Sequence, residues 1–115
     1  MEKITTLKEA LEAVKKDGWA LRYVPNKFRT VELCLEAVKN HAAAFLGVPN
    51  KLKTAEICFE AVKKDGYALA FVPAEFRTVK LCLEAVKHGG WVLQYVPDEL
   101  KTQVEAELRN KYVRV

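Results

Sequence analysis

The chain is built from a unit that recurs every 24 residues. Threonine and proline mark this interval, at Thr6, Thr30, Thr54, Thr78 and Thr102 and at Pro25, Pro49, Pro73 and Pro97. No insertion or deletion interrupts the four units, which cover residues 6–29, 30–53, 54–77 and 78–101. Self-similarity with a period of about 20–50 residues is typical of proteins in which each unit packs on its neighbours. The 115 residues therefore predict one helical-repeat domain, 1–115.

Each unit is expected to fold as a long helix, a short helix and a proline turn. Its threonine suits the N-cap of the long helix, and in the first unit Thr6 and Glu9 have the spacing of a capping box. Asp17 and Gly18 then interrupt the helical pattern. We expect the glycine to end the long helix in the left-handed conformation and the aspartate to cap the short helix over 19–24. Pro25 ends that short helix.

In the inner units the long helix has an unusually wide apolar surface. In the second unit one stripe consists of Val31, Cys34, Leu35 and Val38, and Leu33 and Ala37 lie beside it. A helix with so wide an apolar surface packs on more than one side, as an inner helix of a solenoid does. All six residues are therefore predicted to belong to the core.

The two ends of the array lack one of these surfaces. Glu9 stands where Leu33 stands in the second unit, and a last helix, predicted over 102–113 and capped by Thr102, has one narrow apolar stripe. That stripe consists of Val104, Leu108 and Tyr112. The predicted fold is all-α: a right-handed α-solenoid of four two-helix repeats with a C-terminal capping helix, complete at both ends.

The composition of the chain limits the classes of protein to which it can belong. The net charge of +4 permits an acidic partner without requiring one. No apolar run approaches the length of about 18 residues that a membrane span needs, and the N-terminus lacks the apolar stretch of a secretory signal. Three cysteines are an odd number and lie far apart, which disfavours a disulfide framework. We expect a reducing compartment, most simply the cytoplasm.

The cysteines occupy a single repeat position. Cys34, Cys58 and Cys82 stand where the first unit has Ala10 and the last helix has Ala106. Alternation of cysteine with alanine indicates a close contact that needs a small side chain. Zinc ligands converge to within about 2.3 Å of the metal, whereas equivalent atoms of stacked helices are about 10 Å apart. We therefore expect structural cysteines, no metal site and no cofactor.

Charged residues form columns along the units. His41 and His88 lie near the ends of long helices, where we expect a surface or capping role. Each unit has a glutamate three residues before a lysine, which we interpret as an exposed ion pair: Glu12, Glu36, Glu60 and Glu84 with Lys15, Lys39, Lys63 and Lys87. A basic column precedes the threonines at Arg29, Lys53, Arg77 and Lys101. It could follow a polyphosphate backbone or pair with glutamates of neighbouring repeats.

Aromatic residues form a ladder with one gap. Trp19, Tyr67 and Trp91 share one repeat position, and Tyr23, Phe71 and Tyr95 share another. We expect these rings to pack in the core between units. The second unit has Ala43 and Gly47 instead, which predicts a notch for a ligand or peptide with Leu46 at its rim, unless Phe45 and Leu46 fill the space.

The units resemble a family of bacterial, protist and giant-virus helical repeats that is classed as a domain of unknown function. The resemblance rests on Leu-Cys-Leu-Glu-Ala-Val-Lys at 33–39 and 81–87 and on Gly-Trp/Tyr-x-Leu-x-Tyr/Phe-Val-Pro at 18–25, 66–73 and 90–97. It covers residues 6 to 102 and departs from the pattern at 41–47. The resemblance implies tandem helical repeats and no particular activity.

We therefore predict a scaffold without catalytic residues that binds another protein or a peptide. The chain has no serine, no glycine-rich phosphate loop and no metal-ligand spacing, which argues against an enzyme. The alternative is a nucleic-acid-binding module that uses the basic columns. The candidate binding residues are Arg22, Arg29, Ala43, Leu46, Gly47, Lys53, Arg77 and Lys101. The sequence leaves the partner and the oligomeric state open.

Overall fold

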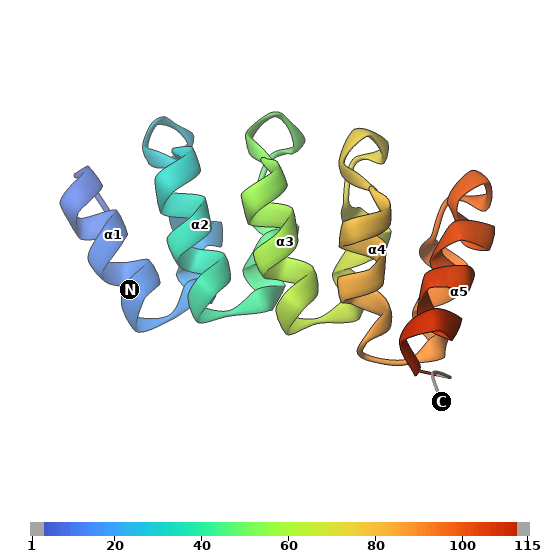
Figure 1. Ribbon diagram of the computed structural model, residues 1–115. Helices are drawn as coiled ribbons and strands as arrows, with labels where there is room; N and C mark the ends of the chain where they lie inside the picture. The colour runs from blue at the N-terminus through green and yellow to red at the C-terminus, as the bar shows by residue number, and fades with distance from the viewer. Residues whose placement is uncertain (1–3, 113–115) are drawn as a thin grey trace.

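The computed structural model describes residues 4–112, and within them the chain consists of helices joined by short turns, without strands. Five α-helices lie side by side in a row (Figure 1). They are α1 (Leu7–Lys16), α2 (Val31–Asn40), α3 (Ala55–Lys64), α4 (Val79–Val86) and α5 (Asp98–Tyr112). Each α-helix packs on the next one along the chain. The molecule is elongated, with extents of 55 × 25 × 18 Å.

The short helices form a second layer behind the row of α-helices. They are 3₁₀-helices: η1 (Gly18–Tyr23), η3 (Ala42–Gly47), η5 (Gly66–Phe71) and η7 (Gly90–Tyr95). Shorter 3₁₀ turns follow the first three prolines: η2 (Asn26–Phe28), η4 (Asn50–Leu52) and η6 (Ala74–Phe76). Each of η1, η3 and η5 contacts the next six-residue 3₁₀-helix and also the α-helix of the following unit. The fold therefore grows by contacts between sequence neighbours.

Threonine caps the first four α-helices, as predicted. The hydroxyl oxygens of Thr6, Thr30, Thr54 and Thr78 accept hydrogen bonds of 3.1–3.2 Å from the backbone N–H three residues later. The capping box of the first unit is shifted by one residue. Glu9 Oε1 accepts from the backbone N–H of Thr5 at 2.9 Å, so the reciprocal bond goes to Thr5 rather than to Thr6.

The last helix begins earlier than predicted. Helix α5 starts at Asp98, so Thr102 lies inside it and does not cap it, and residue 113 of the predicted range is outside the described residues. Asp98 and Glu99 follow Pro97 and stabilise a helix start by their negative charge. Lys101 forms an ion pair with Asp98 at 3.1 Å within the helix. The last unit thus continues directly into α5 without a turn of the η2 type.

The prediction of a left-handed glycine at 18 is wrong, and Gly66, which has the same repeat position, is not left-handed either. Gly89 is the one residue with positive φ between residues 4 and 112, at 153°. Gly18 is needed because the following repeat comes close: a Cβ there would lie 2.4 Å from the carbonyl oxygen of Ala37. At Gly66 the corresponding distance to the carbonyl oxygen of Ala85 is 2.8 Å. Asp17 does cap η1, by accepting a 3.0 Å hydrogen bond from the N–H of Trp19.

The core is a continuous column between the two layers. In α2 the buried side chains are Leu33, Cys34, Ala37 and Val38. Val31 is 39% exposed and Leu35 is half-buried, so the stripe predicted to contain them is only partly in the core. The reason is that the α-helices are covered by the 3₁₀ layer on one side, whereas their outer side faces solvent.

Candidate functional site

The cysteines have the structural role predicted for them. Cys34, Cys58 and Cys82 are free thiols with no exposed surface. Burial raises the pKa of the Cys34 and Cys82 thiols and raises that of Cys58 to about 11. Since a nucleophilic or metal-binding cysteine acts as the thiolate, we expect these buried thiols to react slowly with thiol reagents in the folded protein.

Two polar side chains at one repeat position join consecutive units. Asn40 Nδ2 donates to the carbonyl oxygen of Val14 at 3.0 Å, and His88 Nε2 lies 3.0 Å from the carbonyl oxygen of Lys63. Both reach the C-terminal end of the preceding unit's α-helix, where carbonyls lack partners within the helix. His88 therefore has the capping role predicted for it. His41 instead packs against Trp19, with ring centroids 5.0 Å apart.

Most of the predicted basic column binds backbone carbonyls. Arg29 Nε donates to the carbonyl oxygen of Val24 at 2.9 Å, and Arg77 Nε donates to that of Val72 at 2.8 Å. Lys53 Nζ donates at 2.9 Å to the carbonyl oxygen of Phe71 in the next unit. These side chains therefore close the ends of 3₁₀-helices, and the fourth, Lys101, is paired with Asp98.

Among the described residues, two of the four predicted glutamate–lysine pairs are formed, one in α3 and one in α4. Glu60 and Lys63 lie 3.6 Å apart, and Glu84 and Lys87 lie 3.2 Å apart. Such partly exposed pairs stabilise a helix by a few tenths of a kcal/mol, about 0.3–0.5 each. The two ion pairs therefore give these four charged residues a structural role within the α-helices.

Five of the six rings of the aromatic ladder lie at the surface, so the prediction that the ladder packs in the core is wrong for them, whereas Tyr95 is partly buried and packs against the core. Trp19 and Trp91 are each 40% exposed, and Tyr23, Tyr67 and Phe71 are each 51–52% exposed. The three-residue period of a 3₁₀-helix explains this. In η1 this period places Gly18, Leu21 and Val24 against the core, so the residues between them point elsewhere. We call the surface formed by Trp19, Tyr23, Leu46, Tyr67, Phe71, Trp91 and Tyr95 the aromatic face.

The rings of the aromatic face are ordered by contacts with one another. Tyr67 of η5 stacks on Trp91 of η7 with centroids 3.9 Å apart, and Tyr95 approaches Tyr67 edge-on at 6.3 Å. In η1 the guanidinium of Arg22 lies 5.5 Å from the centroid of Trp19 and 5.3 Å from that of Tyr23. The face therefore contains two preformed aromatic groups, one on η1 and one on η5 and η7.

Helix η3 separates these two groups with small residues. Ala43 and Gly47 stand at the ladder positions and are half-buried. Phe45 is buried at the core position that Leu21 and Leu69 occupy in their units, so it does not fill the gap by a shift of register. Leu46 is 59% exposed.

The aromatic face is almost free of charge. Arg22 is the one charged residue in the four six-residue 3₁₀-helices of the described chain. Protein–protein interfaces have this composition at their centre, where charged residues are depleted and Tyr, Trp, Phe and Arg are enriched. A reading of the sequence with period three instead of 3.6 would have found this surface.

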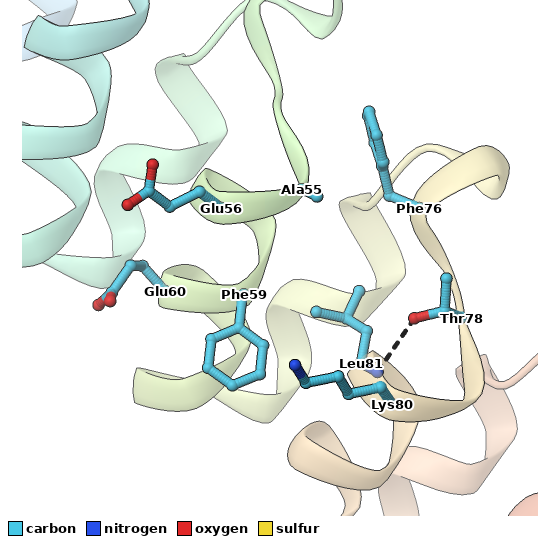
Figure 2. A pocket seen from close by; sticks show the side chains of 8 residues that line it. All are labelled: Ala55, Glu56, Phe59, Glu60, Phe76, Thr78, Lys80 and Leu81. Atoms are coloured by element: carbon cyan, nitrogen blue, oxygen red, sulfur yellow. Dashed lines mark hydrogen bonds between the residues drawn. The ribbon is translucent and has the colours of Figure 1, made fainter.

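The outer side of the α-helices has a second candidate site. A pocket of about 440 Å³ lies between α3 and α4, and Figure 2 shows Phe59, Leu81 and Lys80 close together in it. Its polar groups interact with their surroundings: Lys80 Nζ lies 5.7 Å from the centroid of Phe59, and Glu60 is paired with Lys63. Because half of its eight lining residues are polar or charged, the pocket is a weaker candidate than the aromatic face.

Comparison with protein families agrees with the repeat pattern. The model of the family described as "Domain of unknown function (DUF4116)" matches residues 10–53 and, in an overlapping match, residues 30–77. The chain belongs to this family. The two overlapping matches are consistent with a tandem repeat of the DUF4116 domain. No curated protein and no solved structure matches the chain.

The DUF4116 matches include η1, η3 and η5, so they cover the aromatic group on η1, the gap and Tyr67, whereas η7 with Trp91 and Tyr95 lies outside them. In this DUF4116 chain, none of the helices within the described residues is long and apolar enough to cross a membrane.

Proposed function

We propose that the chain is a non-catalytic scaffold, a right-handed α-solenoid of four repeats, that binds another protein or a peptide through its aromatic face. The observation that carries the proposal is the exposure of large apolar side chains on consecutive 3₁₀-helices that have a single charge among them. Large apolar patches on otherwise polar proteins mark interaction sites.

The energetics favour a protein partner. Tyrosine and tryptophan offer a large contact area with few rotatable bonds, so ordering them on binding costs little entropy. Here the stacking of Tyr67 on Trp91 and the contacts of Arg22 with Trp19 already restrict the side chains. Covering exposed apolar area contributes about 25 cal/mol per Å² before the costs of association are subtracted.

Nucleic-acid binding is the alternative, because exposed rings can stack on unpaired bases. Such proteins combine stacking with a basic groove that follows the phosphates. The aromatic face has only Arg22 as a charge, and Arg29, Lys53 and Arg77 bind backbone carbonyls instead. The surface therefore fits a protein segment better than a polyanion.

Selection of peptides from a random display library against the folded chain tests the proposal. We expect selected peptides to bind the wild type and to lose binding to a Tyr67→Ser/Trp91→Ser variant, because that change removes a preformed aromatic pair. Binding is measured by fluorescence anisotropy.

The matched control is Val31→Ser, which removes an exposed apolar side chain from helix α2 outside the aromatic face. Equal loss of binding in the control and the aromatic variant would contradict the proposal. So would tight binding of single-stranded oligonucleotides that weakens steeply with salt, since this dependence reports phosphate contacts.

A further inference from the structure

The aromatic face has one place that differs from the rest, where η1 meets η3. We infer that this junction binds an acidic residue next to a bulky apolar residue of the partner segment: Arg22 takes the carboxylate, and the gap at Ala43 and Gly47 takes the apolar side chain. The inference rests on the proposed function and specifies the chemistry of the partner.

Arg22 is the one cation on the four six-residue 3₁₀-helices. Its guanidinium is supported by the rings of Trp19 and Tyr23 at 5.5 and 5.3 Å, and none of the salt bridges among the described residues involves it. The side-chain nitrogens of Arg29 and Arg77, in contrast, donate to carbonyl oxygens. A guanidinium held on aromatic rings keeps its edge free for a bidentate pair with a carboxylate.

The gap lies on the 3₁₀-helix that packs next to the one carrying this cation. Helices η1 and η3 are in contact, and a Cβ added to Gly47 would meet only Leu21, the residue before Arg22, at an ordinary contact distance of 3.5 Å. A Cβ can therefore be accommodated at Gly47, where the other units have an aromatic residue. Leu46 stands at the repeat position of Arg22 and is 59% exposed, so it adds apolar surface next to the gap.

Charge complementarity decides between possible partner segments. A basic segment would place a second cation beside Arg22, with no carboxylate on the four six-residue 3₁₀-helices to compensate it. A purely apolar segment would leave the guanidinium with fewer partners than it has in water, which costs free energy. An acidic–apolar segment avoids both costs.

The composition of the selected peptides is the first test. We expect Asp or Glu to be enriched within two positions of Leu, Ile, Phe or Trp. Peptides that bind the aromatic face without enrichment of acidic residues would overturn the inference and leave the proposed function standing. Failure to select any peptide whose binding depends on the aromatic face would overturn both.

A charge exchange is the second test, done with one selected acidic peptide. Arg22→Glu is expected to weaken its binding about tenfold or more, since it replaces a charge-assisted pair by repulsion. Changing the acidic residue of the peptide to lysine should restore binding to Arg22→Glu. The matched control is Lys27→Glu, which changes the net charge equally from a similar position over the ring of Phe28 in η2. Equal effects of the two variants, or no rescue, would overturn the inference.

Discussion

A single methyl group decides how closely two units approach each other. Gly18 and Gly66 are buried where the next α-helix comes near, and a Cβ at either position would lie within 3 Å of a backbone oxygen. Gly90 has the same repeat position, but an added Cβ there would meet no atom within 4 Å. Glycine is thus required at positions 18 and 66, whereas position 90 could accept a larger residue.

The substitution Gly66→Ala is therefore expected to destabilise the protein by about 1–3 kcal/mol, because the α-helix of the next unit must move away. Gly90→Ala is the matched control and should leave stability unchanged or raise it slightly, since alanine reduces the freedom of the unfolded chain. Chemical denaturation of both variants measures the difference. Equal losses would show that close packing is not the reason for glycine.

The cysteine position predicts a dependence of stability on pH. Because the fold favours the neutral thiol, the contribution of Cys58 is complete below the ordinary pKa of 9.0 and is lost as the pH rises to about 11. The melting temperature of the wild type should therefore fall more steeply across this range than that of Cys58→Ala. Parallel curves for the two proteins would show that this thiol does not titrate on unfolding.

Residue-scale features were predictable where they depend on local sequence. The caps by Thr30, Thr54 and Thr78 and by Asp17 involve residues within one turn, so sequence spacing was sufficient. The reason that residue 18 must be glycine was not predictable, because the backbone atom that comes close, the carbonyl oxygen of Ala37, belongs to the next unit of the chain.

At the scale of the element, each α-helix has one side in the core and one side at the solvent. In α2 the apolar residues of the two sides are adjacent in sequence, with Leu33 buried and Leu35 half-buried. Hydrophobic periodicity predicted the first four α-helices, whereas the start of α5 was placed too late in the chain. It did not show which side the 3₁₀ layer covers, because both sides are apolar.

Leu33→Ala should cost about 2–5 kcal/mol by opening a cavity in the core. Leu35→Ala removes the same atoms from a position that solvent already reaches, and it should cost clearly less. Denaturation midpoints of the two variants give the comparison. A larger loss for Leu35→Ala would mean that another surface covers the outer side of the α-helices.

At the scale of the molecule, the aromatic face is the feature that the sequence indicated but placed wrongly. The repeat positions of the rings and the gap at Ala43 and Gly47 were evident from the sequence. Their exposure was not, because large apolar residues are usually buried and the short helices were not expected to have a three-residue period.

Filling the gap at Ala43 and Gly47 tests the arrangement of the aromatic face without a binding partner. The double variant Ala43→Trp/Gly47→Tyr is expected to keep the wild-type melting temperature or raise it, because the added rings extend a ladder on the surface. Thermal unfolding followed by circular dichroism is the measurement. A large decrease in melting temperature would show that other side chains already occupy the space.

Two hydrogen bonds link the ends of consecutive short helices: Lys53 Nζ donates to the carbonyl oxygen of Phe71, and Arg77 Nη1 donates to that of Tyr95 at 3.4 Å. Under tension along the long axis these bonds would be loaded in series, each resisting the separation of one pair of units. The first junction has no such bond from Arg29 among the described residues. Asn40 Nδ2 supplies a bond to the carbonyl oxygen of Val14 at that junction instead, so a molecule stretched between its ends would meet a side-chain hydrogen bond at each of the three junctions between the four units.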